Sequence, residues 1–133
     1  RSVLRKHPGL PTIVAIHDHL NKQGERKAMA IMDFKAAHSE HNNAEDLWQK
    51  LLSRHAQIFL VLSGHHAGQS RRVDVGAQGS KVWQLLADYQ DRDQALRNVL
   101  GPNAPPRAPG AVGLGDGWLR LLEFDFSTPV PRM

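Results

Sequence analysis

The sequence contains no cysteine, which excludes disulfide bonds, thiolate metal sites and a cysteine nucleophile. Any metal ion would therefore be held by histidine, aspartate, glutamate or asparagine. No apolar stretch reaches the roughly 20 residues that a membrane-spanning helix needs, and no run of five basic residues occurs. Neither a membrane nor nucleic acid is expected as a partner, except that nucleic acid could serve as a phosphodiester substrate.

The composition is that of an ordinary folded protein. Of the 133 residues, 41% are hydrophobic and 23% are charged, which predicts one domain over residues 1–133. Residues 101–117 are rich in proline, glycine and alanine and show no periodicity. This stretch predicts a loop or flap within the domain.

Two apolar runs predict buried strands, at residues 11–16 and 58–62. Between them, Asn43 is placed to cap a helix whose apolar residues recur at helical spacing through residue 52. The apolar run at 58–62 has no polar alternation, which is typical of a strand covered on both faces.

The second half of the chain has the pattern of a hairpin. Residues 71–75 and 81–86 flank a turn with glycines at 76 and 79, and residues 118–126 alternate imperfectly as a last strand. The order of strand, helix, strand and then further strands predicts an α/β fold with a mixed sheet and flanking helices. Trp48, Trp83 and Trp118 are expected to pack in its core.

Two histidine clusters follow the two predicted strands. His17 and His19 come after the first strand, and His65 and His66 come after the second. If the strands are parallel neighbours, both clusters lie at the same edge of the sheet, where α/β proteins bind ligands. Neutral imidazole is a common ligand of transition metals. On an extended segment His17 and His19 would point to the same side and could chelate together. Asp18 would then point away unless the strand has already ended.

A simpler interpretation is that a chain with eight histidines places some of them together without any chemical role. Both interpretations stay open on the residues alone.

Residues 58–68 read Ile-Phe-Leu-Val-Leu-Ser-Gly-His-His-Ala-Gly. This stretch resembles the last motif of calcineurin-like metallophosphoesterases, in which Gly-His-x-His follows a hydrophobic strand. The strand that ends at His17 is similar to the lone-histidine motif of the same family. Residues 82–90 and 117–125 resemble the strands that follow in a bacterial branch. The likeness covers about residues 8 to 126, the C-terminal half of that family's domain.

The resemblance implies a hydrolase of phosphate mono- or diesters with small-molecule substrates. In the family, two divalent metal ions activate a hydroxide that attacks phosphorus. The predicted metal ligands are His17, His19, His65 and His66, and the predicted catalytic residues are His65, His66 and Asp18. Zinc, manganese or iron would be the ion.

The chain departs from the family in two ways. Ala67 stands where the motif has its second histidine, and a methyl group cannot bind a metal. The earlier motifs Asp-x-His, Gly-Asp and Gly-Asn-His are not recognisable. We therefore expect a partial site with one ion rather than two, or with none. Half of a metallophosphoesterase-type sandwich would also leave a sheet face bare, which predicts completion by a homodimer or larger assembly.

Four further residues are candidates for substrate binding. Arg71 and Arg72 could clamp a phosphate bidentately, although neighbours on a strand face opposite sides. Tyr89 and Gln90 end the predicted hairpin near the site, where they either contact substrate or complete hydrogen bonds at the strand end.

Two other functions remain open. One is a non-catalytic remnant of the fold that acts as a dimerising module, which Ala67 and the missing motifs favour. The other is a metal-independent serine carboxylesterase, in which Ser63 or Ser70 would be the nucleophile beside the histidines, with Asp74 or Asp88 as the orienting acid.

Overall fold

The computed structural model describes residues 2–27, 34–90 and 119–127. Its helices and strands occur in the following order: α1 (Ser2–Lys6), β1 (Thr12–Ile16), α2 (Phe34–Ala37), α3 (Ala44–Lys50), a 3₁₀ turn (Leu52–Arg54), β2 (Ile58–Ser63), β3 (Gly68–Val75) and β4 (Lys81–Asp88). The predicted α/β class with a mixed sheet is confirmed. The predicted loop at 101–117 and Trp118 lie outside the described residues.

The four strands form one sheet in the order β1-β2-β4-β3. β2 pairs in parallel with β1 and with β4, and β3 pairs antiparallel with β4. The hairpin predicted around Gly76 and Gly79 is confirmed, with Val75 opposite Lys81 at the turn. Gly79 has a φ of +80°, a conformation that glycine adopts without steric cost.

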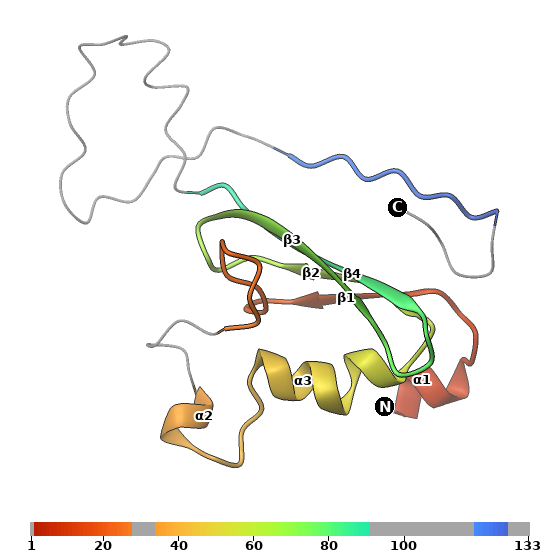
Figure 1. The fold of residues 1–133 in the computed structure, drawn as a ribbon, viewed down its shortest axis with the longest axis horizontal. Helices are drawn as coiled ribbons and strands as arrows, with labels where there is room; N and C mark the ends of the chain where they lie inside the picture. The colour runs from red at the N-terminus through yellow and green to blue at the C-terminus, as the bar shows by residue number, and fades with distance from the viewer. Residues whose placement is uncertain (1, 28–33, 91–118, 128–133) are drawn as a thin grey trace, which may run out of the picture.

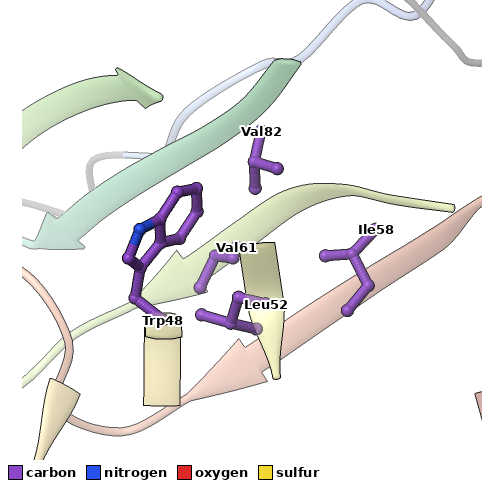
Figure 2. Packing of buried hydrophobic residues seen from close by; sticks show 5 residues of the cluster. All are labelled: Trp48, Leu52, Ile58, Val61 and Val82. Atoms are coloured by element: carbon purple, nitrogen blue, oxygen red, sulfur yellow. The ribbon is translucent and has the colours of Figure 1, made fainter. Parts of the chain in front are cut away.

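Helices cover one face of this sheet (Figure 1). The buried cluster on that face comprises Trp48, Leu52, Ile58, Val61 and Val82, and Figure 2 shows these side chains gathered between α3 and the strands. Leu4 of α1 packs against the same cluster. Trp48 is therefore a core residue, as predicted.

Helix α3 begins where the sequence predicts. The Asn43 side chain accepts a hydrogen bond from the Asp46 N–H at 2.9 Å, and the Asp46 carboxylate accepts one from the Asn43 N–H at 3.2 Å. This reciprocal arrangement is a capping box, which satisfies two backbone donors at once. Helix α2 was not predicted, because a single turn leaves no periodicity to detect.

The opposite face of the sheet carries a second cluster of Phe59, Leu60 and Leu85. Leu122 and Phe124 pack against it from the segment at residues 119–127, which runs along this face (Figure 1). The strand predicted at 118–126 does not form in the described part of this segment, where only Asp125 makes an isolated bridge. Side-chain packing rather than a ladder of backbone hydrogen bonds holds the segment.

None of the helices in the described residues is long and apolar enough to cross a membrane.

Candidate functional site

The loops after β1 and β2 meet at one edge of the sheet. Ile16 pairs with Ser63 at the ends of the two parallel strands. Directly beyond them, the Gly64 N–H donates to the His17 carbonyl at 3.1 Å. The rings of His17 and His65 have centroids 4.6 Å apart. The predicted convergence of the two histidine clusters is therefore confirmed.

A sharp turn after Gly64 presents the second cluster. His65 has a φ of +68°, and the His66 N–H donates to the Gly64 carbonyl at 2.8 Å. Positive φ is rare outside glycine, although histidine is among the residues enriched there, and such conformations cluster at functional sites. The rings of His65 and His66 lie at 85° to each other, with centroids 5.8 Å apart.

Asp18 points toward the second cluster. Its Oδ1 lies 3.1 Å from Nε2 of His66, and both side chains are largely buried. Asp18 was expected to point away only if the strand continued through it, and the strand has already ended. The reason is local, because the extended strand ends at Ile16 and residues 17 and 18 form a bend, so the alternation of a strand no longer applies.

His17 and His19 have different surroundings. His17 is exposed, and its ring lies beside that of His65 at an interplanar angle of 56°. His19 is fully buried, with its Nε2 2.9 Å from Oε1 of Gln84. Burial lowers the pKa of His19, and the nearby Arg26 charge lowers it further, against the opposing effect of the Gln84 hydrogen bond. The simple strand geometry that would let both histidines chelate together is absent.

Two buried nitrogen atoms of this region have no hydrogen-bond partner among the described residues, His19 Nδ1 and His65 Nε2. Asp18 Oδ1 and His66 Nε2 are also buried, and at 3.1 Å they satisfy each other when His66 carries a hydrogen at Nε2. A buried polar atom left unsatisfied costs about 1–3 kcal/mol, so the two nitrogen atoms require an explanation.

Nitrogen and carboxylate oxygen are the atoms that bind zinc and related ions. Two ligands that are each about 2.1 Å from one ion lie about 3.0–3.4 Å apart, and the 3.1 Å between Asp18 and His66 fits both this spacing and a direct hydrogen bond. However, no three His, Asp or Glu side chains in the described ranges are gathered closely enough to hold a metal. These nitrogen and oxygen atoms are of the types that bind a divalent ion, but they form an incomplete set of ligands.

A pocket of about 610 Å³ opens beside His17, on the sheet face opposite the helices. Its wall is mostly apolar and includes Ile16, Leu62, Leu85 and Leu122. Tyr89 and Arg120 also line it, and both donate to Oε1 of Gln69, at 3.1 and 3.4 Å. The prediction placed Tyr89 near the site, but it missed Arg120, which lies in a segment read only as a strand.

The other predicted substrate contacts are arranged differently. Arg72 donates to both carboxylate oxygens of Asp74, at 2.6 and 3.1 Å, while Arg71 on the neighbouring position is exposed. Neighbours on a strand face opposite sides, so the two guanidinium groups do not form one clamp. Gln90 is exposed, and its N–H donates to Asp88, so it completes hydrogen bonding at the strand end.

The serine alternative has no geometric support in the described residues. The Ser63 hydroxyl donates to the Leu85 carbonyl at 3.2 Å, and the Ser70 hydroxyl donates to the Asn21 carbonyl at 2.7 Å. Neither hydroxyl is paired with a histidine, as an activated nucleophile would be.

Over 129 residues, 92% of its length, this chain is 29% identical to the uncharacterized protein YvnB of Bacillus subtilis (strain 168). The chain spans about 7% of the length of that protein. No family model matches the sequence, and no solved structure matches it.

Proposed function

We propose that this chain carries part of the active site of a metal-dependent hydrolase that cleaves phosphate mono- or diesters. The observation that supports this most directly is the group of buried metal-ligand atoms beyond the carboxyl ends of β1 and β2, namely the paired Asp18 Oδ1 and His66 Nε2 and the unpartnered His65 Nε2. The resemblance of the Ser-Gly-His-His-Ala-Gly loop to a phosphoesterase motif gives the reaction class.

The position of each residue determines its role in the proposed reaction. Asp18, His65 and His66 would supply some of the ligands of a zinc, manganese or iron ion, although the described structure does not bring all three around one point. When bound, such an ion polarises a phosphoryl oxygen and lowers the pKa of water. His17 is exposed at the edge of the pocket, where its ring can meet the substrate and transfer a proton at the ester oxygen.

The incomplete ligand set has a consequence for assembly. Because no three suitable side chains gather in the described ranges, the remaining ligands would come from elsewhere, such as a second copy of the chain. Exposed apolar side chains on the pocket face, such as Ile13 and Leu121, support an assembly that covers this face.

Hydrolysis of bis(4-nitrophenyl) phosphate and 4-nitrophenyl phosphate tests this proposal. We expect turnover with zinc, manganese or iron(II), its loss with a chelator, and a drop of about 100-fold in His65→Asn. Asparagine suits this position because it tolerates positive φ. His38→Asn is the matched control, because His38 is exposed outside the site and this variant should keep full turnover.

A second candidate is a non-catalytic module that assembles through the same apolar face. Ala67 in place of a motif histidine and the exposed Ile13 favour it. This candidate predicts no turnover with any divalent ion, and that result would reject the hydrolase.

A further inference from the structure

The pocket beside His17 has an apolar floor that three neighbouring strands build. Ala15 of β1 pairs with Leu62 of β2, and Leu62 pairs with Leu85 of β4. Directly paired residues present their side chains on the same face of a sheet, so these three form one row across it. All three line the pocket, and Leu122 adds a wall from the segment at 119–127.

Small residues leave the pocket open. Ala15 and Ala87 line it and are exposed, and Gly64, directly after β2, lines it as well. The volume of about 610 Å³ lies within the range of about 300–1,000 Å³ that is typical of small-molecule sites. The pocket is therefore large enough for a compact organic ligand.

The wall of the pocket carries positive charge. Arg120 lines it, and a guanidinium group stays protonated in proteins. The Arg120 Nη2 donates to Oε1 of Gln69 at 3.4 Å, and the Tyr89 hydroxyl donates to the same oxygen at 3.1 Å, so Gln69 holds both polar side chains beside the apolar floor. No aspartate or glutamate belongs to the described wall, which favours an anionic ligand.

The pocket adjoins the histidine loops. His17 lines it, and the His17 ring centroid lies 4.6 Å from that of His65. Gly64, whose N–H donates to the His17 carbonyl at 3.1 Å, also belongs to the wall. A ligand in the pocket would therefore lie next to the candidate site.

We propose that this pocket binds the aromatic group of an anionic phosphate ester, with the ring on the row of Ala15, Leu62 and Leu85 and with Arg120 countering the negative charge. The inference names the substrate class of the proposed function and rests on that function. A rigid ring suits a floor formed by one sheet face, because it loses less conformational freedom on binding than a flexible chain would.

Methyl NMR of the ¹³C-labelled chain, without metal, tests the pocket independently of activity. Naphthyl phosphate should shift the methyl signals of Leu62, Leu85 and Leu122 in a saturable way and leave Val3 of α1 unchanged. We expect it to bind at least about 10-fold more tightly than glycerol phosphate, because the ring buries apolar surface that glycerol lacks. Equal affinities, or no shift of these three leucines, would overturn the inference.

Variants that fill the pocket test its location. Ala87→Phe and Ala15→Phe place a ring in the wall at exposed positions, so each should weaken the binding of naphthyl phosphate by about 10-fold or more. Ala77→Phe on the exposed hairpin turn is the matched control and should bind as the wild-type chain does. If both filled variants bind as the control does, the ligand lies elsewhere and the inference is wrong.

The role of Arg120 has its own test. Arg120→Gln should weaken the binding of naphthyl phosphate and leave that of uncharged naphthol unchanged. An equal loss for both ligands, or no loss for either, would overturn the charge role.

Three further outcomes separate this inference from the proposed function. Turnover of 4-nitrophenyl phosphate with no leucine shift by naphthyl phosphate would keep the function and reject the pocket. Saturable binding without turnover by any divalent ion would reject the function, and the assignment of a substrate would fall with it. If dilution of the chain moves the leucine signals and naphthyl phosphate does not, a second copy of the chain occupies the pocket and the inference is wrong.

Discussion

At the scale of single residues, the histidines of the site differ in burial and in hydrogen-bond partners. His17 and His65 could be brought together from the sequence alone, because each directly follows an apolar strand. The pairing of Asp18 with His66 could not, because it depends on a bend that replaces the expected extended backbone. Gln84 could have been noticed as a polar residue within an apolar strand, a pattern typical of a buried side chain that makes hydrogen bonds.

Asp74 makes the stability of the fold depend on pH in the acid range. Hydrogen bonds from Arg72, Gln84 and Arg26 outweigh the effect of burial and lower its folded-state pKa to about 2. This pKa lies below the ordinary value of 3.8, so its contribution is complete above about pH 4 and is lost as the pH falls toward 2. Asp74→Asn should lower the urea midpoint at pH 7 and flatten its decline between pH 4 and pH 2. An unchanged slope in Asp74→Asn would contradict the role given to this carboxylate.

At the scale of elements, structures marked by neighbouring residues could be predicted from the sequence. The pairing of segments that are distant in the sequence could not. Helix α3 and the β3–β4 hairpin were found because a cap and turn glycines mark them within a few residues. The segment at 119–127 has apolar alternation as well, but a strand also needs a free edge with matching hydrogen bonds. The sequence alone does not show whether such an edge is offered.

The capping box of α3 makes a prediction at this scale. Asn43→Ala removes the side-chain acceptor for the Asp46 N–H, so the free energy of unfolding should fall by about 1 kcal/mol. Urea denaturation followed by circular dichroism measures this. Asn42→Ala is the control, because Asn42 only accepts from the exposed Lys50 and its loss should change little. Equal effects of the two substitutions would show that the cap is not important for stability.

At the scale of the whole molecule, several large apolar side chains are exposed. Ile13 on the edge strand β1 is 48% exposed, and Leu119 and Leu121 are 70% and 87% exposed. Surface of this kind is usually covered by another chain. The resemblance also predicts that the chain assembles with other copies, and this stays a prediction.

Sedimentation velocity can test the assembly. The wild-type chain should sediment as a dimer or larger species, and Ile13→Lys should shift it toward monomer because a charge would then lie on the apolar face. Gln78→Lys, on the exposed hairpin turn, should not change the state. A monomeric wild-type chain at micromolar concentration would reject the predicted homo-oligomer.

The most direct test of the central claim is a cobalt(II) titration followed by visible absorption, which reports nitrogen and oxygen ligands around the ion. We predict saturable binding to the wild-type chain, a loss of at least about 10-fold in affinity for His65→Asn, and unchanged affinity for His38→Asn. No saturable binding, or binding that His65→Asn leaves unchanged, would contradict the assignment of this histidine cluster as a metal-dependent site.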